Sequence, residues 1–366
     1  MGKLAMQDEA QPRHPALRGH AAFLEKFAEQ ARSGRLAHGW LLAGPSGIGK
    51  ARVAQTLAAW LLAGGAEQHG LLDNQITAGE ILAGLQGNPQ ARLVLSGAHP
   101  DLLLIRPEAS EQNKSGQIKA DQLRRISAFL SQTAGRGGWR AVILDSLDEV
   151  NRNGANALLK ILEEPPERTV LFCLSGKPGS VLATIRSRCQ LARLHPLGLD
   201  DTRAVLADYW PEAEADTVLD LARLSGGAPG RAVLLAEAGA ADLFAETCSV
   251  IAGGQGAAAF ASLCSRWGPG GAKGRAMRQS ALFLFEQLFA HAARIAAGGQ
   301  QPDWPDFAVA ALRSLSNRHS SGQLADMHRL LLHDLQEAET RYLDFGAVLH
   351  QFFFKIHSQT PASQAM

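Results

Sequence analysis

Short apolar runs alternate with helix-like stretches along residues 17–174. Each run has the length and the bounding turn residues of a buried strand, and the stretches between the runs place apolar residues three and four positions apart, as an amphipathic helix does. Strands that alternate with helices predict a parallel sheet with helices on both faces. The predicted strands are residues 38–43, 101–105, 140–144 and 169–174, and the predicted helices are residues 17–31, 50–63, 119–132 and 154–164.

The pattern changes after Pro196, beyond which only helical spacing recurs. Residues 198–240 predict two or three short helices, and residues 241–357 predict longer ones. A chain of 366 residues exceeds what one ordinary core accommodates. We therefore expect three domains, which are an α/β domain over residues 1–196, a small helical domain over residues 197–241 and an all-helical domain over residues 242–366.

A glycine-rich segment joins the first predicted strand to the helix that follows it. The segment consists of Gly44, Pro45, Ser46, Gly47, Ile48, Gly49, Lys50 and Ala51. Between a strand and a helix, such a loop turns its backbone N–H groups toward phosphate oxygens, and the helix N-terminus adds a partial positive charge. Lys50 can reach the β and γ phosphates of a nucleotide. The alternative is an ordinary turn with one solvated lysine.

Two positions that ATP hydrolysis needs lack the required groups. A hydrolysing phosphate loop ends in Ser or Thr, whose hydroxyl binds Mg²⁺, but this loop ends in Ala51. The strand at 140–144 is followed by Asp145 and Ser146. AAA+ ATPases have, at the position of Ser146, a glutamate that polarises the attacking water. Asp148 and Glu149 are displaced from the strand end, and we expect them to be solvated or capping. The sequence predicts a pocket able to hold ATP or ADP that does not hydrolyse it.

Several segments resemble the clamp-loader subunits of bacterial DNA polymerase III, which are AAA+ proteins. Residues 156–166, NALLKILEEPP, are similar to a long segment of that family, and Ser187-Arg188-Cys189 resembles its SRC motif. Residues 99–101 and 118–124 resemble further stretches of one subunit. The resemblance implies a RecA-like AAA+ P-loop domain over 1–196, a helical lid over 197–241 and, over 242–366, a helical collar that joins five subunits in a ring.

The resemblance also implies roles for two arginines. In the family, the SRC arginine stabilises charge on the γ-phosphate in a neighbour's ATP site, and by position this is Arg188. Arg186 is the lesser candidate. The alternative for Arg188 is a structural arginine paired with a carboxylate at a helix end. Arg231 lies one place late in a segment that resembles the family's sensor, so we assign it no phosphate contact.

The partners that the resemblance implies are the motor (gamma/tau) and delta subunits in a heteropentamer. The sliding clamp and primer–template DNA would be met through that complex. Within it, this chain would be a non-hydrolysing stator with no ATPase activity of its own. An active AAA+ motor subunit is the alternative, and Ala51 and Ser146 disfavour it.

Charge disfavours a free-standing DNA-binding regulator. The 36 basic residues nearly cancel the 35 acidic ones, for a formal net charge of +1, whereas DNA held by charge alone needs a basic excess. No run of 18 apolar residues appears, and the N-terminus lacks the apolar stretch of a signal peptide, so we expect a cytoplasmic protein without a membrane span.

The cysteines predict packed thiols and no zinc. Cys173, Cys189, Cys248 and Cys264 form no CxxC pair. Many clamp-loader subunits have a four-cysteine zinc module after the phosphate-loop helix, but residues 64–98 contain no cysteine. Residues 64–92 are rich in glycine and weakly patterned, so we expect an irregular insertion there, with one short helix near 78–86.

Overall fold

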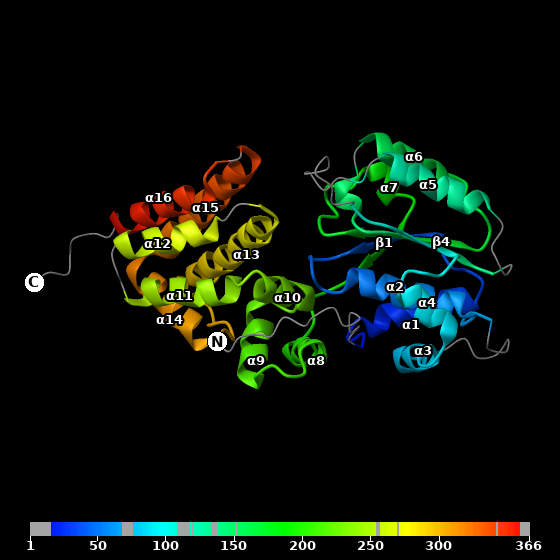
Figure 1. Ribbon diagram of the computed structural model, residues 1–366, viewed down its shortest axis with the longest axis horizontal. Helices are drawn as coiled ribbons and strands as arrows, with labels where there is room; N and C mark the ends of the chain where they lie inside the picture. Colours follow the sequence, from blue (N-terminus) through cyan, green and yellow to red (C-terminus); the bar gives the residue numbers. More distant parts are fainter. Residues whose placement is uncertain are drawn as a thin grey trace, which may run out of the picture. The chain divides into compact units, whose positions relative to one another are not determined.

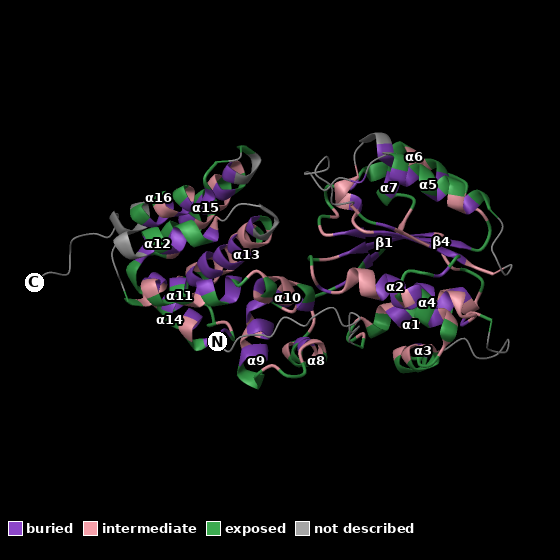
Figure 2. Ribbon diagram, viewed as in Figure 1, coloured by how far each residue is buried: buried purple, intermediate pink, exposed green. Residues whose placement is uncertain are grey.

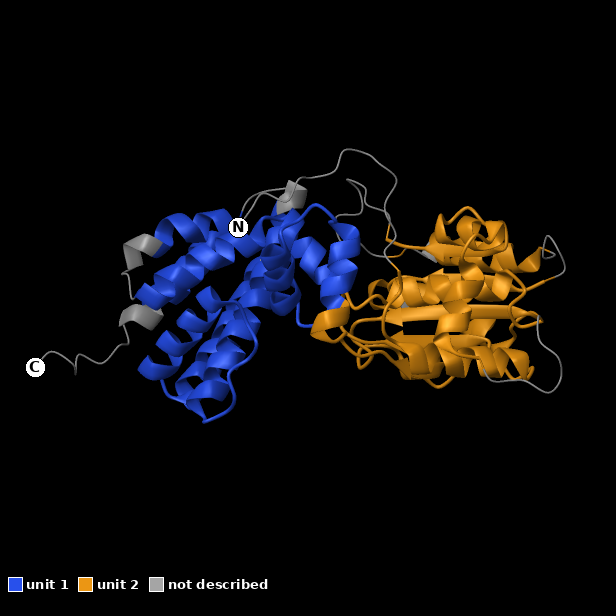
Figure 3. Cartoon of the chain, turned by 90° about the horizontal axis from the view of Figure 1, so that it is seen from below, with its two compact units in different colours: residues 1–14, 202–366 blue, residues 15–201 orange. Residues whose placement is uncertain are grey.

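The computed structural model describes residues 16–67, 76–107, 118, 120–132, 138–150, 152–253, 257–268, 271–341 and 343–358. The chain divides into two compact units, one of residues 15–201 and the other of residues 1–14 and 202–366 (Figure 3). This boundary lies close to the change of pattern at Pro196. The further division of 197–366 into a lid and a collar stays a prediction.

A five-stranded sheet lies at the centre of the first unit (Figure 1). Its strands are all parallel, in the order β2-β3-β4-β1-β5. The three inner strands, β1 (Gly39–Ala43), β3 (Arg140–Leu144) and β4 (Thr169–Ser175), are buried along their whole length, as expected where helices cover both faces. The predicted parallel sheet is confirmed.

The two edge strands are shorter. They are β2 (Leu102–Ile105), which the sequence predicted, and β5 (Gln190–Arg193), which it missed. Strand β5 contains only one buried residue, Ala192, and its Leu191 is exposed. A four-residue edge strand with so little apolar content gives no buried-strand signal.

Helices cover both faces of the sheet, and the buried residues gather along it (Figures 1 and 2). One face is covered by α1 (Ala21–Arg32), α2 (Lys50–Leu62), α3 (Ala78–Leu85) and α4 (Pro89–Leu95), and the other by α5 (Ala120–Ser131), α6 (Arg152–Glu163) and α7 (Ala183–Arg186). A short 3₁₀ helix, η1 (Leu147–Glu149), follows β3.

The insertion contains two helices where the sequence predicted one. Helix α3 matches the expected helix near 78–86, and α4 is additional. The signal for α4 is present in the sequence. Asn88 caps its N-terminus by accepting hydrogen bonds from the N–H groups of Gln90 and Ala91, and Pro89 occupies the first helical turn, where its missing N–H has no cost.

The second unit is helical throughout its described part, as predicted. Helix α8 (Leu199–Tyr209) begins at the boundary, and the helices beyond it are α9 (Ala215–Leu224), α10 (Pro229–Glu237), α11 (Ala240–Gly253), α12 (Ala257–Trp267), α13 (Gly271–Ala296), α14 (Asp306–Arg318), α15 (Ser321–Arg341) and α16 (Phe345–Ser358).

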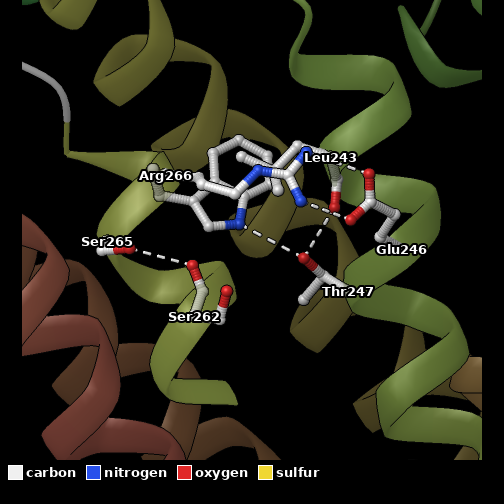
Figure 4. Close-up of polar contacts among 7 residues, drawn as sticks. Leu243, Glu246, Thr247, Ser262, Ser265 and Arg266 are labelled. Carbon is white, nitrogen blue, oxygen red and sulfur yellow. Dashed lines mark hydrogen bonds and ion pairs between the residues drawn. The ribbon is translucent and has the colours of Figure 1, made fainter. Parts of the chain in front are cut away.

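Polar contacts join α11 to α12 beside the aromatic core of this unit. The buried Trp267 indole donates to Thr247 Oγ1 over 3.2 Å, and Thr247 Oγ1 donates to the Leu243 carbonyl over 2.7 Å. At the surface, Arg266 pairs with Glu246 through both guanidinium Nη atoms (Figure 4). The buried tryptophan is therefore fully hydrogen-bonded within the helical core.

Candidate functional site: the phosphate loop and the SRC arginine

The structure places residues 44–49 as a tight loop between β1 and the first turn of α2. Gly47 and Gly49 have φ angles of 85° and 97°, in the left-handed region that favours glycine. A Cβ atom on Gly44 would lie only 2.4 Å from the Leu194 carbonyl oxygen, so this position has no room for a side chain. Backbone close to the neighbouring strand and left-handed glycines together give the loop the shape of a phosphate cradle.

Lys50 lies over this loop. Its Nζ donates to the carbonyl oxygens of Gly44, over 2.8 Å, and Pro45, over 2.9 Å. Asp145, which follows β3, lies at the same carboxyl edge of the sheet, with its Oδ2 3.6 Å from Arg106 Nε. Burial raises the pKa of the Asp145 carboxyl, and Arg106 and Lys50 partly offset that rise. The lysine and the acidic residue that a nucleotide site needs are therefore brought together.

Ala51 and Ser146 have the places expected of them. Ala51 lies in the first turn of α2 and offers no metal ligand. Ser146 follows Asp145, and its hydroxyl donates to Asp148 Oδ2 over 3.0 Å. Ala51 has no oxygen that could coordinate Mg²⁺, and the Ser146 hydroxyl cannot accept a proton from water at neutral pH.

Asp148 is partly buried, and its carboxylate caps the backbone at the end of β4, in keeping with the capping alternative. Its carboxylate also accepts hydrogen bonds from Ser175 Oγ and from Gly176 N–H, each over 2.6 Å. Ser175 is the last residue of β4 and Gly176 follows it, so Asp148 connects the end of β3 to the end of β4. Three donors share this carboxylate, and it is therefore not placed to orient a water molecule.

Arg188 lies at the opposite end of the strands. Its carbonyl oxygen is 3.3 Å from the place a Cβ on Gly39 would occupy, at the start of β1, whereas the phosphate loop follows the end of that strand. The four steps from Gly39 to Ala43 span about 13 Å at ~3.3 Å per residue. Arg188 is thus remote from the phosphate loop of its own chain.

Arg188 is both exposed and paired. Its Nη2 is 2.7 Å from Glu163 Oε1 at the end of α6, and its Nη1 donates to the Thr184 carbonyl over 3.0 Å. The pairing with a carboxylate at a helix end, which was the structural alternative, is present. The exposure that an arginine serving another chain requires is also present. Arg186, also exposed, only donates a 3.4 Å hydrogen bond to the Pro178 carbonyl.

Arg231 packs within the helical unit. Its guanidinium carbon lies 3.8 Å from the centre of the Phe283 ring on α13, and its Nη1 donates to the Ser225 carbonyl over 3.2 Å. Burial lowers the pKa of Arg231, and Glu286 offsets part of that decrease. These contacts favour a packing role over a phosphate contact.

The described part of the chain contains neither a cluster of metal ligands nor a membrane-spanning helix. There, no group of three or more His, Cys, Asp and Glu residues could hold a metal ion. Over the same residues, none of the helices combines the length and the apolar character needed to cross a bilayer. Cys173, Cys248 and Cys264 are buried thiols, and Cys189 is half-buried.

Glu163 and Gly39 lie beside Arg188, and His38 contacts the residue before Glu163; the sequence predicted no functional role for these three residues. Glu163 belongs to the quoted 156–166 segment, so a signal was present, but its partner lies 25 positions away (188 minus 163) and only the fold brings the two together. His38 precedes β1 and Gly39 begins it. Neither residue belongs to a recognisable motif, unlike the phosphate loop that follows the strand.

In a comparison with known proteins, residues 19–198 match the family described as "DNA polymerase III, delta subunit". The chain is 39% identical over 194 residues to DNA polymerase III subunit delta' of Pseudomonas aeruginosa, covering 53% of this chain and 54% of the relative. It is 30% identical over 215 residues to subunit delta' of Escherichia coli K12, covering 58% of each. The chain thus spans about half the length of the curated relatives it matches.

A solved structure of a DNA polymerase III gamma subunit-related protein from Thermotoga maritima is 18% identical, with a TM-score of 0.40 over 92% of this chain and 99% of that one. A likeness at this level adds nothing to the assignment, which depends on the sequence match. That match covers the sheet, the phosphate loop and the SRC segment. Residues 19–198 are thus similar to the DNA polymerase III delta subunit family, and the relatives that match this chain include proteins named subunit delta'.

Proposed function

We propose that this chain is the delta' subunit of a DNA polymerase III clamp loader. It acts as a non-hydrolysing stator in the complex that loads the sliding clamp onto primed DNA during replication. It also presents Arg188 to the ATP site of a neighbouring ATPase subunit. The family match over residues 19–198 and the relatives named delta' support the assignment.

The observation that best supports the role of Arg188 is its position relative to the phosphate loop. The loop lies at the carboxyl end of β1 and Arg188 beside its amino end, about 13 Å of strand apart. An arginine finger must contact the γ-phosphate oxygens directly. Arg188 is therefore too far from its own loop and, being exposed, is available to the loop of another chain.

The chain's own loop is suited to holding ATP or ADP without hydrolysis. Lys50 and the loop N–H groups can donate hydrogen bonds to phosphate oxygens, and Asp145 lies nearby. Ala51 removes the side-chain Mg²⁺ ligand, and Ser146 has no carboxylate. Asp148, the first acidic residue after Ser146, is already hydrogen-bonded to Ser146, Ser175 and Gly176.

The partners follow from the same assignment. Residues 242–366 of the helical unit would form the collar that joins the gamma/tau and delta subunits in a heteropentamer. The clamp and the primer–template DNA would be contacted through the assembled complex. The near-neutral net charge of +1 supports a chain that does not bind DNA strongly alone.

The test is a clamp loader reconstituted with Arg188→Ala. An arginine finger contributes roughly 10³ to 10⁵ in rate at the site it serves. Because one site in the ring borders this subunit, total ATPase activity should fall partially and clamp loading should fall further. Arg188→Lys should not rescue, since an ammonium lacks the planar fork of the guanidinium. Wild-type ATPase and loading rates in a fully assembled Arg188→Ala complex would show that Arg188 is only structural.

A further inference from the structure

The Arg188 guanidinium is held from two sides. Glu163 Oε1 accepts from Nη2 over 2.7 Å, and the Thr184 carbonyl accepts from Nη1 over 3.0 Å. The two acceptors come from different elements, the end of α6 and the turn of α7. Since the guanidinium is planar, one contact at each Nη fixes the orientation of the whole group.

The backbone beneath this pair is packed against one glycine. A Cβ atom on Gly39 would lie 2.8 Å from Leu162 Cδ2, 3.3 Å from the Arg188 carbonyl oxygen and 3.4 Å from Cys189 Sγ. Leu162 precedes Glu163, and Cys189 follows Arg188. Both members of the ion pair are therefore attached to residues that meet at the same buried point on β1.

A hydrogen bond also holds the backbone beneath the ion pair. The His38 ring Nε2 lies 3.0 Å from the Leu162 carbonyl oxygen, which connects the end of α6 to the residue before β1. Leu162, the residue before Glu163, and Ile185, three residues before Arg188, are buried at 2% and 1% exposure. The buried core therefore fixes the distance between the backbone at Glu163 and the backbone at Arg188. The two exposed side chains span that fixed distance to form the ion pair.

The exposure of the pair indicates what it does. The Arg188 and Glu163 side chains are 36% and 49% exposed. Ion pairs this exposed contribute little to folding stability. What the contact does restrict is the rotamer freedom of a long side chain, since Arg188 held at both Nη atoms samples fewer orientations than a free surface arginine.

We propose that Glu163 is a positioning residue for Arg188: it orders the guanidinium before the neighbour's ATP site meets it. The inference rests on the role proposed above for Arg188. Glu163 does not touch the nucleotide in this scheme. It acts by keeping Arg188 in one orientation, so that less side-chain freedom is lost when the arginine contacts the γ-phosphate.

The experiment compares clamp loaders reconstituted with Glu163→Ala, Glu163→Gln or Glu163→Asp chains. ATPase rates are measured with clamp and primed DNA over a range of ATP concentrations. Removing one charge-assisted hydrogen bond at an exposed site should lower the part of kcat that depends on Arg188 by about fivefold. KM should change little. Glu163→Gln should lie between wild type and Glu163→Ala, and Glu163→Asp should rescue part of the loss.

Two controls isolate the effect. Glu164→Ala removes the adjacent exposed carboxylate and should leave the rates at the wild-type level. In an Arg188→Ala background, Glu163→Ala should have no further effect, because the residue it positions is gone. Assembly of each complex is checked by native mass spectrometry, and if Glu163→Ala assembles poorly the isosteric Glu163→Gln decides.

The outcomes separate the two proposals. If Arg188→Ala lowers the rates but the Glu163 variants leave them unchanged or raise them, the positioning role is wrong and the proposed function stands. A rise would mean that Glu163 competes with the phosphate for Arg188. If Arg188→Ala itself has no effect, the proposed function has failed at this residue, and the positioning role fails with it.

Discussion

Ala51 and Ser146 each remove one group that ATP hydrolysis requires, and Asp148 does not replace either. The isolated chain should therefore show no Mg²⁺-dependent ATP turnover in a steady-state phosphate-release assay. Ala51→Thr should restore a Mg²⁺ ligand but no turnover, because the Asp148 carboxylate is shared by three donors. Turnover by the wild-type chain that Lys50→Ala abolishes would contradict this account.

A second residue-scale prediction concerns His291 on α13. Its ring lies 4.9 Å from the Trp304 ring, and burial, with a smaller contribution from Arg294, lowers the pKa of His291 from 6.5 to about 4. Between those values the unfolded chain binds a proton that the folded chain does not, so stability falls as the pH decreases from 6.5 toward 4.

The expected size is modest because the ring is half-exposed. Halving the full linkage effect for solvent screening gives a loss of about 1 kcal/mol in the free energy of unfolding between pH 7 and pH 5. His291→Phe keeps the edge contact with Trp304 and should remove that loss. Urea denaturation at both pH values measures it, with His333→Gln on the exposed face of α15 as the control. An equal pH dependence in wild type and His291→Phe would contradict the prediction.

The sequence could locate single residues only where a contiguous motif identifies them. The phosphate loop lies within eight adjacent positions, and Arg188 lies in a three-residue motif. The partners of Asp148 and Arg188 could not be found in this way. Asp148 meets Ser175 because β3 and β4 are adjacent and end together, and that adjacency is a property of the sheet.

At the scale of elements, Arg231 joins α10 to α13 through the Phe283 ring. Arg231→Ala should lower the free energy of unfolding of the helical unit by about 1–2 kcal/mol, since it removes a partly desolvated cation–π contact and the bond to the Ser225 carbonyl. The measurement is urea denaturation followed by circular dichroism.

The matched control is Arg329→Ala. Arg329 pairs with Asp326 on the surface of α15, and exposed pairs of this kind contribute about 0–1 kcal/mol. Combining Arg231→Ala with Phe283→Leu should cost less than the sum of the two single changes, because both remove the same contact. Strict additivity would show that the two side chains do not interact.

The strands and helices of the first unit were predictable to the extent that each buries its own apolar pattern. The inner strands are continuous apolar runs because both of their faces are covered. Strand β5 escaped prediction because its Leu191 faces solvent, and its pairing with β1 gives it the strand conformation. Helix α4 is short, and it depends on packing against α2 as well as on its cap.

At the scale of the whole molecule, the unit boundary predicts where the chain can be cut. A fragment of residues 16–201 retains the entire sheet and its covering helices. It should unfold cooperatively and bind little of a dye that reports exposed apolar surface. A fragment that ends at residue 241 adds α9 and α10 without α11 and α13, against which α10 packs.

That longer fragment should bind more dye and be cleaved by proteases after residue 201. Its α10 has Ala232 and Leu235 buried in the intact chain, and these would be exposed. Equal dye binding and protease resistance for the two fragments would show that residues 202–241 pack independently of the rest of the helical unit.

If Arg188 serves a neighbour's ATP site as proposed, its separation from the phosphate loop along β1 gives this chain a direction. A chain with a receiving end and a donating end can only join others head to tail, in one order around a ring. If the receiving end does not hydrolyse ATP, the junction formed there cannot turn over. Such a ring has a fixed first member and therefore a defined seam, so cycles of ATP hydrolysis would open and close it at one place rather than at random.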